Sequence, residues 1–185
     1  MPNYCNYSMY VKGEKEKVEE FIKVIQADYD YNIMEFGYNR HLFRVFEAEC
    51  NGVEELGDDE WAAIINGYCA WSVASCMFED GYYKDCKERF KENFRGTTLI
   101  EESKKLNLEI EVFSEECGNC FQEHYRIRYG ELEVDECVDW YEYYLDEFET
   151  KEEAEKELEI KITDEEWEEG GYISRGGFDE WDFEI

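Results

Sequence analysis

Residues 5–25 read CNYSMYVKGEKEKVEEFIKVI, and their hydrophobic period changes at Gly13. Before the glycine, apolar and polar residues alternate from Cys5 to Lys12, which is the two-residue period of a strand with one buried face. After it, apolar residues recur every three or four positions among lysines and glutamates, which is the period of an amphipathic helix. The stretch therefore predicts a strand that leads directly into a helix.

Further strands are predicted in the first half of the chain. Residues 41–50 are rich in aromatic and β-branched types, and residues 68–78 alternate larger apolar residues with small ones. The acidic triplet 58–60 is expected to cap a short helical turn between these strands. Residues 80–94 fit either a helix or a tyrosine-rich insertion, and periodicity does not decide between them.

A second helix is predicted over residues 98–106. It begins with a capping box, in which a threonine side chain and a glutamate three residues later each accept a backbone N–H. Alternation then predicts strands over 108–112, 121–129 and 132–134, with Gly130 in the last turn. The order of elements predicts an α+β fold with a largely antiparallel sheet.

Two more capping boxes lie in the acidic C-terminal part. Thr150 is followed by Glu153, and Thr163 by Glu166. These pairs predict a helix from about residue 151 and a shorter one after residue 164.

Charge is the most unusual property of the chain. It has 49 acidic and 19 basic residues, a net charge of −30. Residues 131–185 contain 23 acids and 4 bases, so this part alone carries −19. Self-repulsion of this size opposes compaction, so we expect the charge to serve the recognition of a basic partner. Nucleic acid and anionic membranes are disfavoured as ligands, because they carry the same sign of charge. With 12 Phe, 15 Tyr and 5 Trp, the chain is expected to be folded throughout.

Several segments resemble the YubB-type ferredoxin-like domain, a family found mostly in phage and plasmid proteins of unassigned activity. The resemblance lies in MPNYCNYSMYVKG (1–13), INGYCAWSVASCMF (65–78), GTTLIEESKKLNLEIEVFSEE (96–116) and FQEHYRIRYGELEVDECVDWYEYY (121–144). It implies a ferredoxin-like core domain over residues 1–145, with helices on one face of the sheet. Residues 146–185 depart from the family pattern and are expected to form an acidic helical or irregular extension packed on that core.

The resemblance also suggests a function, because some small phage proteins are anti-CRISPR proteins that present carboxylates where a nuclease expects nucleic acid. This chain looks like that type. The expected partner is a type II CRISPR nuclease with its guide RNA, and the expected effect is a block of DNA binding or cleavage. The alternative is a phage or plasmid accessory module without catalysis, which binds another basic host protein or self-assembles through an exposed sheet edge. The cytoplasm of an infected bacterial host is the expected location, since the start of the chain lacks the features of a secretory signal.

The acids expected to contact this partner follow the predicted hairpin and the next helix. Carboxylates two residues apart on a strand stand about 6.7 Å apart on one face, so a folded acidic surface can approximate a row of phosphates. A solvated surface that only confers solubility is the alternative. The predicted contact residues are Glu131, Glu133, Asp135, Glu136, Asp139, Glu142, Asp146, Glu147, Glu149, Glu152 and Glu153.

Aromatic residues lie among these acids and could stack on arginine side chains of the partner. Their alternative role is core packing, which is the preferred interpretation for Trp140. The aromatic residues concerned are Trp140, Tyr141, Tyr143, Tyr144 and Trp167.

Neither a cofactor nor catalysis is expected. The eight cysteines are expected to be mostly reduced and buried, because the chain lacks the context of a disulfide scaffold. A weak zinc candidate of the Cys₃His type consists of Cys117, Cys120, His124 and Cys137. Otherwise His124 is expected on the surface of the hairpin. Glu109 with Glu111, or Cys137 with His124, are the weak catalytic candidates.

Overall fold

A computed structural model of the protein describes residues 3–27 and 40–185. The strands are β1 (Tyr4–Gly13), β2 (His41–Leu42), β3 (Val45–Cys50), β4 (Glu54–Gly57), β5 (Glu60–Ala70), β6 (Gly96–Thr97), β7 (Glu109–Glu116), β8 (Phe121–Arg128), β9 (Glu131–Tyr144) and β10 (Tyr172–Gly176). The helices are α1 (Lys15–Ile25), α2 (Val73–Met77), α3 (Gly81–Phe90), α4 (Leu99–Leu106), α5 (Lys151–Leu158) and α6 (Asp164–Glu169), with short 3₁₀ turns η2 (Lys91–Asn93) and η3 (Leu145–Glu147).

The fold is α+β, as predicted, with one eight-stranded sheet in the order β10-β9-β8-β7-β1-β5-β3 and β4 also paired to β5. All of its strand pairs are antiparallel. The short strands β2 and β6 form a separate parallel pair. No helix within residues 3–27 and 40–185 is long and apolar enough to cross a membrane.

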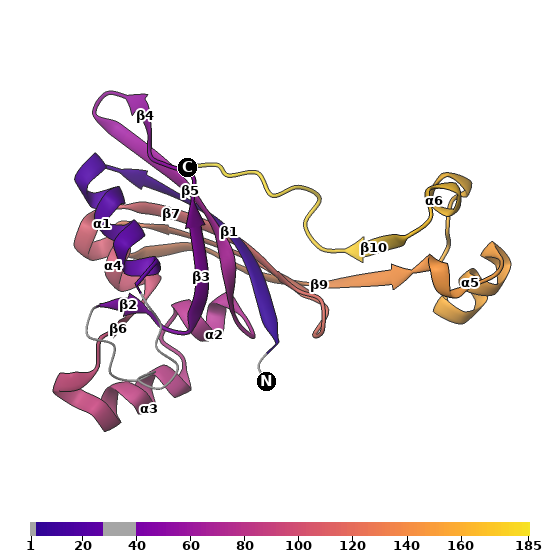
Figure 1. The fold of residues 1–185 in the computed structure, drawn as a ribbon, viewed down its shortest axis with the longest axis horizontal. Coiled ribbons are helices and arrows are strands. Elements are labelled where there is room, and N and C mark those ends of the chain that lie inside the picture. Colours follow the sequence, from indigo (N-terminus) through magenta and orange to yellow (C-terminus); the bar gives the residue numbers. More distant parts are fainter. Residues whose placement is uncertain (1–2, 28–39) are drawn as a thin grey trace.

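Helices α1 and α4 cover one side of the sheet, which we call the helix face (Figure 1). The core between them contains the alternate residues of β1 that the sequence predicts to be buried, together with Phe21 of α1 and Leu99 of α4. The opposite side, which we call the open face, carries the other set of β1 residues, such as Tyr10. The amphipathic period of residues 5–25 therefore places both elements as predicted.

The third predicted strand is in the wrong place. Its true extent is Glu60–Ala70, and residues 73–77 form helix α2 instead. Trp71 has a left-handed φ of 65° that ends the strand, and the Ser72 side chain accepts the Ser75 N–H to start the helix. The residues after Trp71 form a helix of five residues, which is too short for the 3.6-residue period of a helix to be recognised in the sequence.

The acidic triplet 58–60 begins no helical turn, so that prediction is also wrong. Asp58 and Asp59 both have left-handed φ values, of 52° and 64°. They form the tight turn between β4 and β5, because two successive positive φ values match the twist of a two-residue hairpin.

The other predicted elements are present, with some changes in extent. The predicted strand over 41–50 is split into β2 and β3 by a turn at Arg44, whose φ is 58°. Residues 80–94 contain helix α3, which begins where Asp80 accepts the Tyr83 N–H at 2.6 Å. Helices α4, α5 and α6 begin at the predicted threonines. Strand β9 is much longer than the predicted 132–134, since its distal part pairs with β10.

Residues 140–177 form a small unit at the end of β9, which we call the arm. Its hydrophobic cluster contains Leu145, Ala154, Ile162 and Ile173, and it is separate from the core under α1 and α4. Figure 1 shows α5 and α6 well away from the rest of the molecule, connected to it by β9 and the chain after β10. The predicted domain boundary at residue 145 stays a prediction.

Residues 178–185, which we call the tail, run from β10 back over the open face (Figure 1). Phe183 stacks on Tyr10 of β1, with ring centroids 5.6 Å apart, and Trp181 stacks on Phe113 of β7 at 5.8 Å. The tail therefore reconnects the arm to the body of the sheet.

Candidate partner-binding surface

The arm is held together by its own apolar cluster and by a defined set of its carboxylates. Thr150 and Thr163 start α5 and α6 by accepting the N–H groups of Glu153 and Glu166. Five acids then bond to other parts of the arm. Asp146 accepts the Gly171 N–H, Glu153 the Glu149 N–H and Glu155 the Ile162 N–H, while Asp164 binds Lys151 and Glu166 binds Arg175.

The remaining carboxylates of the two helices and their flanks are exposed. They form no hydrogen bond or ion pair with another residue of the described chain. These residues are Glu147, Glu149, Glu152, Glu157, Glu159, Glu165, Glu168 and Glu169. The arm as a whole has 14 acids and 4 bases, a net charge of −10. Two of those bases, Lys151 and Arg175, already bind carboxylates, so most of the negative charge faces solvent.

Two of the bonded carboxylates of the arm, those of Glu166 and Asp164, have a lowered pKa. The Arg175 guanidinium, followed by the Thr163 backbone N–H, lowers the pKa of Glu166 to about 2. The hydrogen bond from Lys151 likewise lowers the pKa of Asp164. A carboxyl whose pKa falls on folding stabilises the fold above its unfolded pKa, and this stabilisation is lost as the pH falls through the folded value.

We expect Arg175→Gln to raise the pKa of Glu166 from about 2 toward its ordinary value of 4.5. The cause is loss of the two guanidinium hydrogen bonds, at 2.8 and 3.1 Å. Carbon-detected NMR titration of the Glu166 carboxyl measures this shift. Lys151→Gln is the control, because it should raise the pKa of Asp164 and leave Glu166 unchanged. A Glu166 carboxyl that titrates near pH 2 in the Arg175 variant would contradict this assignment.

The acids of β9 do not form a single evenly spaced row. A bulge interrupts the β8–β9 pairing between Arg126 and Ile127, so the pairing skips Glu133. Beyond it, Asp135 lies opposite Tyr125 and therefore on the helix face, whereas Glu136 lies opposite His124 on the open face. The carboxylates thus flank the strand on both sides instead of lining one face as expected.

The predicted contact acids differ in how accessible they are. All eleven are exposed except Glu142, which is half-buried and accepts the Tyr144 hydroxyl at 3.2 Å. Glu133 lies 3.5 Å from the Arg128 guanidinium, and Glu136 lies 3.8 Å from His124. Glu131, Asp135, Asp139, Glu147, Glu149 and Glu152 form no side-chain contact of this kind within the described part of the chain.

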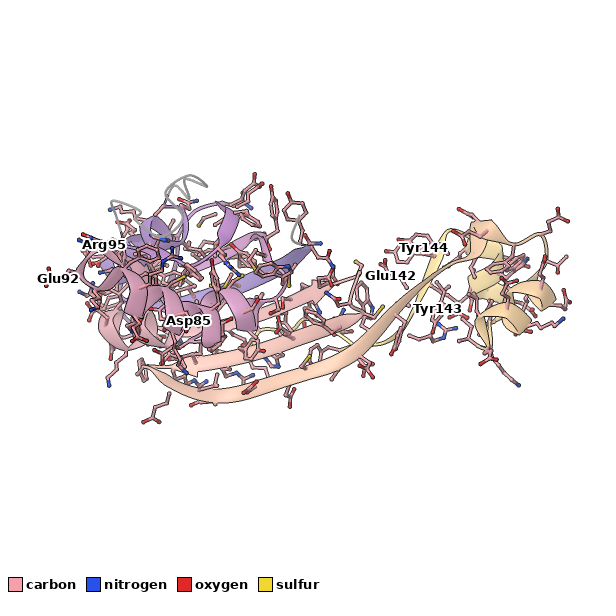
Figure 2. The ribbon with its side chains drawn as sticks, turned by 90° about the horizontal axis from the view of Figure 1, so that it is seen from below. Asp85, Glu92, Arg95, Glu142, Tyr143 and Tyr144 are labelled. Atoms are coloured by element: carbon pink, nitrogen blue, oxygen red, sulfur yellow. The ribbon has the colours of Figure 1, made fainter. Side chains whose placement is uncertain are left out.

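The aromatic residues of the arm divide into a packed and an exposed group. Trp140 is buried but belongs to neither the arm's cluster nor the core under α1 and α4, whereas Tyr143 and Trp167 pack against the arm's cluster. Tyr144 is 55% exposed and lies across from Tyr172, which is 59% exposed. Figure 2 shows Glu142, Tyr143 and Tyr144 in the narrow part of the arm, where it joins the rest of the sheet. Exposed tyrosine rings beside carboxylates can stack on a partner's arginine.

The structure does not bring the four zinc candidates together. Cys137 lies opposite Glu123 on the helix face, whereas His124 points to the open face. Burial and neighbouring carboxylates raise the pKa of the Cys117 and Cys137 thiols, which disfavours the thiolate that zinc needs. Within residues 3–27 and 40–185, no group of three or more His, Cys, Asp or Glu side chains could hold a metal ion. None of the eight cysteines forms a disulfide, and Cys117 and Cys137 are exposed instead of buried.

A buried ionic cluster under the tail was not predicted from the sequence. Glu111 is fully buried and binds His124 at 2.7 Å and Arg126 at 2.7 and 3.0 Å. The Glu184 N–H of the tail donates to the same carboxylate at 2.7 Å, and its side chain binds Arg126. His124 is therefore not a surface residue of the hairpin: its side chain is only 12% exposed and stacks on Phe113 at 4.0 Å.

The sequence contains one indirect indication of this buried ionic cluster, the aromatic residues of the tail. The tail has Phe178, Trp181 and Phe183 within an acidic stretch, and such a spacing of aromatic residues indicates a segment that packs against another surface. Glu111 alternates with apolar neighbours in β7, which looked like an ordinary exposed position. Only the return of the tail over the open face buries it.

Comparison of the chain with protein-family models, with curated proteins and with solved structures found no match. The resemblance to the YubB-type domain therefore stays a prediction. The features that bear on function are the charge and accessibility of the arm and its own apolar cluster.

Proposed function

We propose that this protein is a non-enzymatic inhibitor whose arm occupies the basic nucleic-acid site of another protein. The observation that carries the proposal is the set of exposed carboxylates on the arm that have no partner within the described chain, such as Glu149, Glu152 and Glu157. Lysine and arginine residues that hold phosphates in a nucleic-acid site attract these carboxylates, because the charges are opposite. Once the arm occupies that site, nucleic acid can no longer enter it.

The order of the arm supports specific binding over a purely solubilising role. Its carboxylates stand on helices and a strand pair that share one apolar cluster, so little conformational entropy is lost when they meet a partner. Exposed Tyr141, Tyr144 and Tyr172 add aromatic surface suited to guanidinium groups. A surface that only keeps a protein in solution needs neither a packed scaffold of its own nor exposed tyrosines.

We propose a type II CRISPR nuclease with its guide RNA as the target. The arm occupies the nucleic-acid site of this nuclease and so blocks DNA binding or cleavage. The resemblance to the phage and plasmid YubB-type domain supports this target class. It accords with a ferredoxin-like arrangement of the core, for which the strand order β7-β1-β5-β3, with α1 after β1 and α4 before β7, is the supporting feature. The acidic residues 146–185 are then the specialised extension of that core.

Competition in a mobility-shift assay tests the proposal. The purified protein is added to the nuclease–guide complex before or after labelled target DNA, at salt concentrations from 50 to 300 mM. We expect loss of the DNA-bound band when the protein is added first, and weaker inhibition at high salt because exposed charges are screened. Binding that ignores salt would contradict the electrostatic mode. If the protein does not bind the nuclease but captures another basic protein from host lysate, the proposed target is wrong and the proposed electrostatic binding mode still stands.

A further inference from the structure

The outer edge of β9 between residues 131 and 138 is unpaired. Strand β10 pairs only with Trp140–Tyr144, and no other strand of residues 3–27 or 40–185 lies on that side. The Trp140 N–H donates toward β8, to the Cys120 carbonyl at 2.9 Å. Since backbone groups alternate along a strand, the N–H and C=O groups of Asp135 and Cys137 point outward to this free edge. Both residues are exposed.

Two glycines leave this edge open. Gly176 and Gly177 have φ values of 75° and 78°, and the Gly177 N–H donates to the Asp139 carbonyl at 2.8 Å. A Cβ atom on Gly176 would stand 2.4 Å from that same carbonyl oxygen. The chain therefore leaves β9 at this point, and the Phe178 N–H bonds instead to the Gln122 side chain on the open face at 2.8 Å.

The charge of the edge restricts what can pair with it. Residues 131–139 contain five acids and no base. A second copy of the same strand would set carboxylates close to carboxylates, which destabilises a strand pair. An extended segment that carries lysine or arginine would set opposite charges side by side while its backbone fills the open hydrogen bonds.

We propose that the outer edge of β9 binds an extended basic segment of the partner by strand addition. The proposal rests on the proposed function and specifies how the partner is held there. Backbone hydrogen bonds to Asp135 and Cys137 supply a contact that does not depend on charge, and the flanking carboxylates select basic side chains. The bulge at Glu133 and the Gly177–Asp139 hydrogen bond limit regular pairing to about residues 134–138, so the bound segment is short.

The test uses the full chain and the peptide acetyl-Lys-Val-Lys-Thr-Lys-Val-Lys-amide as the probe. The comparison peptide has the same side chains with every backbone nitrogen methylated, which keeps the charge and removes the N–H donors. We expect the methylated peptide to bind at least tenfold more weakly. We also expect the unmodified peptide to slow hydrogen exchange of the Asp135 and Cys137 amides.

A protein variant provides a second measurement. Cys137→Pro removes one outward N–H, which an edge position tolerates, and should weaken peptide binding about five- to tenfold. Cys137→Ala keeps that N–H and should bind as the native protein does. If the two peptides bind equally and amide exchange does not change, the strand-addition proposal is overturned while salt-sensitive nuclease inhibition still stands. If neither peptide binds, strand addition is overturned as well, and the mobility-shift assay decides the proposed function independently.

Discussion

Replacement of Glu111 by alanine should lower the free energy of unfolding by about 3–5 kcal/mol, since it leaves the partly buried Arg126 guanidinium without its buried anion and removes the hydrogen-bond partner of His124. The Glu111 carboxylate is fully buried and accepts hydrogen bonds from His124, Arg126 and the Glu184 backbone. Without it, the tail also loses its polar attachment to the open face. Chemical denaturation followed by tryptophan fluorescence measures the change, because Trp181 stacks on Phe113 beside the cluster.

Glu111→Gln is the matched variant, because it keeps the shape of the side chain and removes only the charge. Burial alone would raise the pKa of Glu111, but the hydrogen bonds from His124 and Arg126 outweigh it and hold the pKa below 4.5. The carboxylate therefore stabilises the native protein fully above about pH 4.5, and less as the pH falls through the lower folded value. The stability difference between the native protein and the glutamine variant should shrink below pH 4.5. A difference that is constant from pH 7 to pH 3 would contradict this role.

Neutralising Glu149, Glu152 and Glu157 together, each to glutamine, should weaken binding to the proposed nuclease about ten- to hundredfold. Each exposed charge pair is worth up to about 1 kcal/mol, and every 1.4 kcal/mol changes affinity tenfold. Stability should change by less than about 0.5 kcal/mol, because none of the three side chains has a partner in the described chain. Surface plasmon resonance at two salt concentrations measures the affinity and its dependence on charge.

The triple variant Asp85→Asn, Glu88→Gln and Glu92→Gln provides the control. These acids are also exposed, and they lie on or just after α3, which Figure 1 shows far from the arm. Both variants change the net charge by +3, so any difference between them reports location and not total charge. Equal losses of affinity in the two variants would show that the arm has no special role.

Local patterns in the sequence predict most elements correctly because each is encoded by its own residues. The capping boxes at Thr98 and Thr163 form with both of their hydrogen bonds. The third strand was misplaced because Trp71 ends it through a backbone conformation that no hydrophobic pattern indicates. The length of β9 was missed for a different reason, since its distal part depends on pairing with β10 about thirty residues later.

The candidate site was predictable in composition but not in geometry. Ten of the eleven acids expected to contact a partner are exposed. Their arrangement on two faces of β9 depends on a bulge that the sequence does not reveal. The division of the arm's acids into bonded and free groups was equally hidden, because the partners of Glu155 and Asp146 lie several to many residues away.

The separate apolar cluster of the arm has an evolutionary consequence. It shares no residue with the core beneath α1 and α4. If the surface of the partner changes during evolution, the exposed side chains of residues 146–169 can therefore be substituted without disturbing the apolar cluster that supports them. Homologues should then diverge fastest in this segment, while Leu145, Ala154, Ile162 and Ile173 keep their size and apolar character.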